Sequence, residues 1–306
     1  MFAFDPKSHT DLLPFRECLK PWWDNRPSDV IGLALYGSRA KNCAEQYSDW
    51  DIVIFTSSDN PDEDAICRDL PRVYDKAPIH ALCESIATVK SEAEYGGSVM
   101  SAIAEQGVSL FGMTVPFQED TIKHPSYSLA ETLFSSTLEA LKGFLSEANI
   151  RFLKKKSRDK DATTHSAHAA EYLVKSFMCV RGINYFYVHD VKALCAQIEE
   201  EIPNDPLLKE FRELDGFTAK GHTGPYRLLH LPSESLENTT ERIYRVLALL
   251  PRLAIEIFAG RDAPLDTKNT ISDKLLVLQK STSELEDALL QKRFQNTLSE
   301  ITEFFV

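Results

Sequence analysis

The sequence predicts an α+β protein in which a small mixed sheet with a few helices is followed by an α-helical bundle. Short apolar runs separated by turns occupy roughly residues 28–115, in the strand, turn, helix, strand order of a compact α/β unit. Beyond Pro116 the apolar residues recur with helical spacing, as in amphipathic helices that pack together. We therefore expect two domains, residues 1–118 and 119–306.

The elements of the first domain follow from its apolar runs and its turn residues. Strands are expected at residues 31–36, 51–55 and 79–89, with a brief further strand after Gly107. Helices are expected at residues 11–24, 39–46, 62–69 and 98–107. In the second domain, helices are expected around the apolar stripes, joined by polar loops, with a long connection over residues 202–232 and a helical extension over residues 271–306.

The charge of the chain bears on its partners. The formal net charge is −12, and the one dense basic run is Lys154-Lys155-Lys156. Proteins that grip nucleic acid usually carry a basic balance or a basic stripe, so nucleic acid is not an expected partner. An acidic chain better suits a cationic small molecule, a protein acceptor or a metal–nucleotide complex.

Cysteine usage and the absence of long apolar runs indicate the compartment. The six cysteines are scattered and form no CxxC pair, as expected of free thiols in a reducing environment. Charged residues interrupt every apolar stretch of residues 1–20, and no run is long enough to span a bilayer. We therefore expect a cytoplasmic protein without a membrane segment.

The most informative stretch is a glycine-serine pair that precedes two aspartates. Gly37 and Ser38 end the first expected strand, and Asp49 and Asp51 open the second. Side chains alternate along a strand, so the two aspartates project to the same side. Neighbouring carboxylates repel each other unless a cation lies between them, and Mg²⁺ prefers carboxylate oxygens together with phosphate oxygens and water. Because Gly37 permits close approach of a phosphate and Ser38 can donate its hydroxyl, the stretch combines a phosphate cradle with metal ligands.

This stretch resembles the nucleotidyltransferases of the DNA polymerase β superfamily, especially its minimal prokaryotic members. The matching residues are Tyr36-Gly37-Ser38, a spacer of ten residues, and Asp49-Trp50-Asp51-Ile52. The resemblance implies a nucleotidyltransferase fold for the first domain, with Gly37 and Ser38 binding the phosphates of ATP or another nucleoside triphosphate. It also implies that Asp49 and Asp51 hold two Mg²⁺ ions. The implied reaction transfers a nucleoside monophosphate, AMP from ATP in the first instance, to a hydroxyl of a small molecule or protein.

Two further site residues are expected beside this pair. The family uses a third carboxylate on a later strand, and the resemblance implies Glu84 as catalytic residue and metal ligand, with Asp75 as the second choice. A lone acid within an apolar strand favours a functional role for Glu84, because burying it without a partner is costly. Loss of the third acid would leave nucleotide binding without catalysis. Arg39 is placed among the nucleotide-binding residues, with a salt bridge as the alternative.

Residues 165–198 resemble HEPN helical domains, which often accompany minimal nucleotidyltransferases. The resemblance covers about residues 125–260 and rests on Ala169-Ala170-Glu171 with Lys175, on His189-Asp190 and Leu194, and more loosely on Pro225-Tyr226-Arg227. HEPN ribonucleases carry an arginine closer to the histidine than Arg181 is to His189, so nuclease activity is not expected. Glu171 and Lys175 lie one helical turn apart, and the spacing favours a structural ion pair over substrate binding.

The resemblances leave three functions open, of which the third, an enzyme that adds nucleotides to RNA ends, is disfavoured by the acidic charge balance. The first is the transferase described above. The alternative is a non-catalytic nucleotide-binding regulator, or a HEPN/nucleotidyltransferase protein of the toxin–antitoxin type. The oligomeric state is also open, with a homodimer among the states that the sequence allows.

Overall fold

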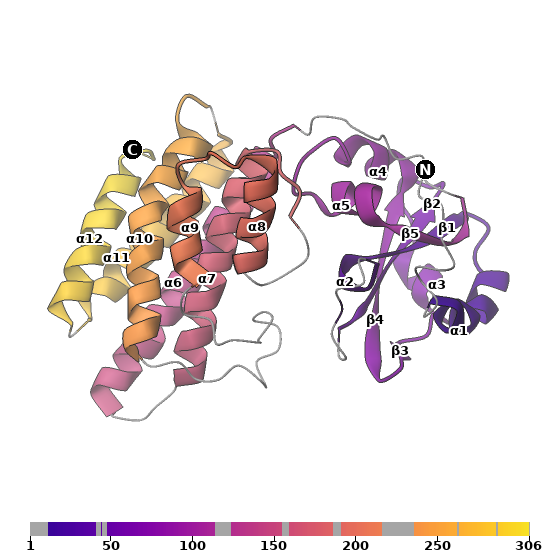
Figure 1. The fold of residues 1–306 in the computed structure, drawn as a ribbon, viewed down its shortest axis with the longest axis horizontal. Helices are drawn as coiled ribbons and strands as arrows, with labels where there is room; N and C mark the ends of the chain where they lie inside the picture. Colours follow the sequence, from indigo (N-terminus) through magenta and orange to yellow (C-terminus); the bar gives the residue numbers. More distant parts are fainter. Residues whose placement is uncertain are drawn as a thin grey trace. The chain divides into compact units, whose positions relative to one another are not determined.

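The structure is a computed structural model that describes residues 12–40, 44, 48–113, 124–154, 159–185, 191–215, 236–261, 263–285 and 287–305. The chain divides into two compact units, residues 1–124 and residues 125–306, and each is described by itself (Figure 1). The first holds a small mixed sheet with helices and the second is helical, which confirms the predicted α+β class. Several expectations lie outside the described residues: most of the helix at 39–46, Cys43, Lys155, Lys156, Arg158, His189, Asp190 and residues 225–227.

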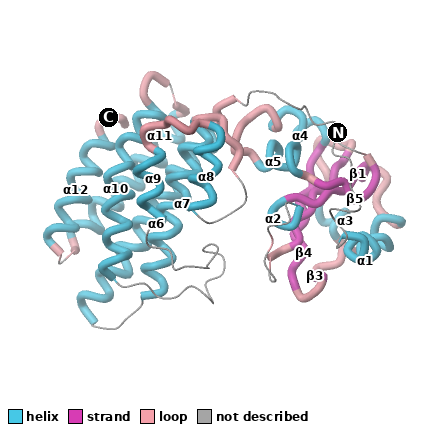
Figure 2. Tube along the Cα trace, viewed as in Figure 1, coloured by secondary structure: helices cyan, strands magenta, loops and turns pink. Residues whose placement is uncertain are grey.

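The described part of the first unit contains a five-stranded sheet in the order β3-β4-β2-β1-β5. Its strands are drawn in magenta in Figure 2. Its strands are β1 (Val30–Tyr36), β2 (Trp50–Thr56), β3 (Val73–Tyr74), β4 (Ala77–Ser85) and β5 (Val108–Gly112). β1 pairs antiparallel with both β2 and β5, whereas β4 runs parallel to β2. The parallel pair makes the sheet mixed and places β4 directly beside the strand that carries Asp51.

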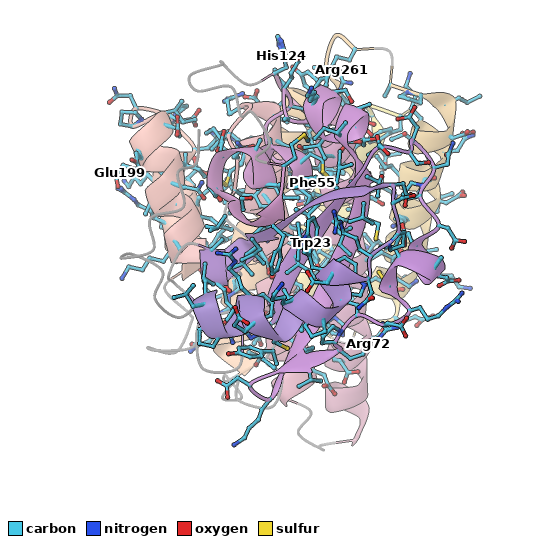
Figure 3. All side chains as sticks on the ribbon, turned by 90° about the vertical axis from the view of Figure 1, so that its right-hand side faces the viewer. Trp23, Phe55, Arg72, His124, Glu199 and Arg261 are labelled. Carbon is cyan, nitrogen blue, oxygen red and sulfur yellow. The ribbon has the colours of Figure 1, made fainter. Side chains whose placement is uncertain are left out.

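Helices cover both faces of the sheet. Helices α1 (Leu12–Asp24) and α3 (Glu63–Cys67) share a buried cluster with one set of alternating strand residues, including Leu35 and Ile52. Helices α4 (Ile86–Glu92) and α5 (Val99–Gln106) share the other cluster, which includes Val53 and Phe55 (labelled in Figure 3). Because side chains alternate along β2, Asp51 lies on the same face as Val53 and Phe55.

One predicted strand is shorter than expected. The strand expected over residues 79–89 ends at Ser85, and α4 begins at the next residue. The Ser85 hydroxyl accepts a hydrogen bond from the backbone N–H of Thr88 at 3.0 Å, which is the arrangement of a helix N-cap. The apolar run alone favours continuation of the strand, whereas the cap residue within it starts a helix.

The second unit consists, in its described residues, of helices α6 (Tyr127–Lys154), α7 (Asp159–Val180), α8 (Val191–Glu201), α9 (Leu208–Asp215), α10 (Leu236–Phe258), α11 (Leu265–Ser283) and α12 (Ala288–Thr302). Each contributes buried side chains to one hydrophobic cluster, for example Phe134, Phe177, Leu194, Phe211, Leu250, Leu275 and Phe294. The long connection expected over residues 202–232 contains α9, whose Phe211 and Leu214 are buried. Among the described helices, none is long and apolar enough to cross a membrane.

The ion pair that the spacing predicts in α7 is present and buried. Lys175 Nζ lies 2.6 Å from Glu171 Oε1, and their side chains are 6% and 1% exposed.

We expect Lys175→Met to lower the free energy of unfolding by about 3–5 kcal/mol, because it leaves the Glu171 carboxylate buried without its counter-charge. The double variant Glu171→Gln, Lys175→Met should recover most of this loss. Urea unfolding of both variants tests the prediction, and a single variant as stable as the native chain would contradict it.

Candidate active site

The bend between β1 and α2 (Gly37–Ala40) lies against the second aspartate. Gly37 has φ +74°, and a Cβ added to it would lie 2.7 Å from Asp51 Oδ2. The cause is the antiparallel register, which pairs Tyr36 with Asp51. Two constraints therefore favour glycine at position 37: its left-handed backbone conformation, and the Asp51 carboxylate, which leaves no room for a Cβ. Ser38 follows this bend as the second residue of α2 and is half-buried.

The two aspartates lie beside a histidine, His80, that no motif of the sequence singles out. His80 Nδ1 is 3.7 Å from Asp49 Oδ2 and 3.8 Å from Asp51 Oδ1. The parallel register of β2 and β4 pairs Asp51 with His80. The side chains of Asp49, Asp51 and His80 are 43%, 28% and 60% exposed, so a ligand from solvent can reach all three. We call these three residues, together with Gly37, the acidic site.

A half-buried tyrosine, Tyr36, borders the acidic site from β1. Burial raises the pKa of Tyr36, and the negative charge of Asp51 raises it further. Its phenol is therefore neutral at physiological pH and keeps its proton as a hydrogen-bond donor beside the aspartates.

Arg39 serves the architecture of the acidic site. Its Nε donates to the backbone carbonyls of Ser48 and Asp49 at 2.9 and 3.1 Å, and its guanidinium lies 4.1 Å from the centre of the Trp50 ring. Trp50 in turn stacks on Phe15 of α1. The guanidinium thus ties α2 to the start of β2 and orients the segment that carries both aspartates. The role of Arg39 in nucleotide binding stays a prediction.

The structure does not bring Glu84 to the acidic site. Glu84 pairs with Phe55, four residues along β2 from Asp51, which separates the two backbones by roughly 13 Å. Two carboxylates at that distance cannot share a metal ion whose ligands stand about 2.1 Å away. The second choice, Asp75, lies in the exposed turn between β3 and β4, further from His80 along the chain than Glu84 is. On β4, the residue directly beside Asp51 is His80 and not a carboxylate.

The surroundings of Glu84 predict a measurable effect on stability. Burial raises its pKa above the ordinary value of 4.5, and Glu92 and Glu63 raise it further. Because the folded-state pKa is raised, the stability that the neutral acid contributes is present below about pH 4 and lost as the pH rises through the folded pKa. We expect Glu84→Gln to raise the free energy of unfolding at pH 7 by about 0.5 kcal/mol and to change nothing below about pH 4.

Urea unfolding of native and Glu84→Gln protein at both pH values measures this difference. The variant should also keep any nucleotidyl transfer within about twofold of the native rate, since Glu84 lies away from the aspartates. A large loss of nucleotidyl transfer in a normally folded Glu84→Gln protein would show that Glu84 takes part in the reaction.

The donor set of the acidic site suits a metal that arrives with its own ligands. Among the described residues, no group of three or more His, Cys, Asp and Glu side chains is arranged to hold a metal ion by itself. Asp49 and Asp51 together offer carboxylate oxygens at one exposed place. Mg²⁺ in nucleotide enzymes usually takes one or two carboxylates and completes its shell with phosphate oxygens and water. The two aspartates fit that requirement.

In the second unit, the arginine considered for nuclease chemistry is engaged in ion pairs. Arg181 donates to both carboxylate oxygens of Glu256 at 2.8 and 3.2 Å and to Asp205 at 3.3 Å. The hydrogen bond to Glu256 raises the pKa of Arg181 and lowers that of Glu256. The guanidinium also lies over the Phe177 ring. Through these contacts, Arg181 in the loop after α7 is bound to α10 and to the loop before α9. This is a structural role.

Comparison with known proteins concerns the helical unit. The family model of the HEPN domain matches residues 139–252, which run from α6 to α10 and make up less than half of the chain. Comparison with curated proteins yields no match. The match confirms the HEPN part of the sequence prediction, whereas the nucleotidyltransferase part stays a prediction. Residues 139–252 of this chain are therefore similar to the HEPN domain family.

Proposed function

We propose that the first unit is a Mg²⁺-dependent nucleotidyltransferase that transfers a nucleoside monophosphate, AMP from ATP in the first instance, to a hydroxyl group. The observation that carries the proposal is the contact between the glycine bend and the aspartate. A Cβ on Gly37 would meet Asp51 Oδ2 at 2.7 Å, and Asp49, two residues earlier, lies beside the same His80 as Asp51. A phosphate seated at the bend would therefore lie beside the carboxylates that hold its metal.

The chain's own residues divide the work. Asp49 and Asp51 hold the metal–triphosphate complex, Gly37 leaves room for the phosphates, and the Ser38 hydroxyl donates to them. Arg39 fixes the segment that carries the aspartates through its bonds to the carbonyls of Ser48 and Asp49. Bound Mg²⁺ supplies charge neutralisation of the triphosphate and polarisation of the attacking hydroxyl. Positioning and electrostatics account for most of the rate in such a displacement.

The acceptor class follows from charge and from the HEPN match. The net charge of −12 suits a polycationic small molecule such as an aminoglycoside. A protein hydroxyl suits the HEPN domain, which often accompanies minimal nucleotidyltransferases. Both acceptors belong to the same proposed reaction at the α-phosphorus.

Incubation with ATP labelled at the α-phosphate, Mg²⁺ and each acceptor class tests the proposal. We expect label on one acceptor with the native chain and none with the double variant Asp49→Ala, Asp51→Ala. Omission of Mg²⁺ should abolish the transfer. Transfer that persists in the double variant would refute the proposed site. The absence of transfer to every acceptor would favour a nucleotide-binding regulator without transfer chemistry.

The second candidate is a nucleotide-binding regulator without transfer chemistry, and one observation favours it. The strand beside Asp51 carries His80, and Glu84, the third carboxylate that the resemblance implies, pairs with Phe55 instead. A site with two carboxylates can bind a metal–triphosphate complex, and it lacks the third acid that the family uses on the acceptor. This candidate predicts ATP binding that depends on Asp49 and Asp51 without any labelled product.

Changing His80 to a carboxylate tests the role of this position. We expect His80→Asp to raise the Mg²⁺-dependent affinity for ATP about tenfold, because it adds a third anionic ligand beside the two aspartates. His80→Asn is the matched control, since it removes the imidazole without adding charge. Calorimetric titration with and without Mg²⁺ measures the difference. Equal affinities for the two variants would show that position 80 does not reach the bound metal.

A further inference from the structure

Two thiols lie in contact across separate elements of the first unit. Cys67 ends α3 and Cys83 lies within β4, and their sulfur atoms are 3.7 Å apart. Both are free cysteines. Cys83 is buried, whereas Cys67 is half-buried, so a reagent from solvent reaches Cys67 first. The two cysteines are 16 residues apart in the sequence and belong to no motif, so the sequence alone does not predict their contact.

The backbone around both thiols is anchored. The carbonyl of Ile66 accepts a hydrogen bond from Trp22 Nε1 at 3.0 Å, and the carbonyl of Cys67 accepts one from the N–H of Leu70. Cys83 pairs with Ile54 inside the parallel ladder. Both sulfurs are therefore held near each other by the fold. A disulfide bond needs them about 2.05 Å apart, and side-chain torsions can supply the remaining approach.

The contact also divides the chemistry between the two sulfurs. The hydrogen bond between the two thiols lowers the pKa of Cys67 to about 7, and the positive charge of Arg72 adds to this effect while burial opposes it (Arg72 is labelled in Figure 3). The same hydrogen bond and burial raise the pKa of Cys83. Near neutral pH, about half of Cys67 is thus thiolate whereas Cys83 keeps its proton, which suits Cys67 as the reactive and Cys83 as the resolving cysteine.

We propose that Cys67 and Cys83 form a reversible redox pair that closes to a disulfide when the protein reacts with hydrogen peroxide. The Cys67 thiolate attacks one oxygen of the peroxide, the O–O bond breaks, and hydroxide leaves, which produces a sulfenic acid on Cys67. The sulfur of Cys83 then attacks the sulfur of Cys67, the S–O bond breaks, and the thiol proton leaves with the oxygen as water. The two thiols lose two electrons, and the peroxide, which takes up the two thiol protons, is reduced to two waters.

The pair is independent of the proposed transfer. Cys83 lies in the cluster on the α1 and α3 face of the sheet, whereas Asp51 projects from the opposite face. Closure of the disulfide ties α3 to the central part of β4. Because it restricts the unfolded chain, it should raise the Tm of the first unit by on the order of 10 °C.

Titration of the full chain with hydrogen peroxide, followed by peptide mapping without reductant, tests the proposal. We expect one linked pair of peptides carrying Cys67 and Cys83, which dithiothreitol separates again. Cys18→Ser, a half-buried cysteine of α1, is the control and should leave the linkage unchanged. A map without this linkage, or with Cys67 joined equally to several other cysteines, would overturn the proposal.

Two variants of Cys83 separate the hydrogen bond from the covalent bond. Cys83→Ser keeps a hydroxyl donor beside Cys67 and cannot form the disulfide, so oxidation should stop at a sulfenic acid that dimedone traps on Cys67. Cys83→Ala removes the donor, and the alkylation of Cys67 at pH 7 should be about threefold slower than in the native chain. Equal alkylation rates in the native, Cys83→Ser and Cys83→Ala proteins would contradict the assignment of Cys67 as the reactive thiol.

Discussion

Replacing Asp51 by Asn should reduce nucleotidyl transfer by at least about 100-fold while leaving the fold intact. The amide has the shape of the carboxylate and lacks its charge, so the metal–triphosphate complex loses one of its two protein anions. The same change relieves repulsion between Asp49 and Asp51, so the free energy of unfolding should not fall. The measurement is the rate of label transfer from ATP at several Mg²⁺ concentrations, together with urea unfolding.

The matched control for this variant is Asp75→Asn. Asp75 is an exposed aspartate of the same unit, in the turn between β3 and β4, and its φ of +46° is one that Asn accepts readily. It removes the same charge at a distance from the acidic site, so transfer should stay near the native rate. If both variants lowered transfer equally, the loss would reflect net charge, and Asp51 would have no special role. A stable Asp51→Asn protein with full activity would refute the site.

Replacing Gly37 by Ala should have the second largest effect, on stability and on transfer together. The residue has φ +74°, which costs an alanine about 1–2 kcal/mol. In addition, the new Cβ would stand 2.7 Å from Asp51 Oδ2, so the carboxylate must move. We expect the Tm of the first unit to fall, and transfer to fall at least about tenfold because the aspartate leaves its place beside the bend.

Gly260→Ala separates the backbone cost from the contact. Gly260 has φ +72°, close to that of Gly37, and a Cβ added there would meet nothing within 4 Å. Both variants therefore carry a similar backbone cost, each within its own unit. The additional loss in Gly37→Ala reports the approach of Asp51. Losses of equal size, with transfer unaffected by Gly37→Ala, would show that the carboxylate adapts freely and that the bend does not position it.

The local parts of the acidic site could be predicted from the sequence, because they depend on short-range rules. A left-handed bend after an apolar strand favours glycine, and alternation along the next strand places Asp49 and Asp51 on one side. A strand that returns antiparallel after a short connection brings those aspartates back to the bend, as the register of Tyr36 with Asp51 shows. The helical spacing of Glu171 and Lys175 was predictable for the same reason, since their distance is a property of one helix turn.

The neighbours supplied by more distant strands could not be predicted in this way. His80, Leu82 and Glu84 project from the same face of β4. The alternation of side chains along a strand does not distinguish between them. Which one stands beside Asp51 depends on the register of β4 against β2, and that register is set by packing between residues far apart in the chain. The contact of Cys67 with Cys83 likewise depends on where α3 packs on the sheet.

The sequence by itself therefore determined the α+β class, the glycine bend and the pair of aspartates on one face, because bond geometry and strand alternation act over a few residues. Only the tertiary structure decided that His80 lies beside these aspartates and that Glu84 lies four residues further along β4 than His80. It also decided that Arg39 donates to backbone carbonyls. The physical reason is that strand register and side-chain partners arise from the packing of the whole unit, where many distant contacts are satisfied together.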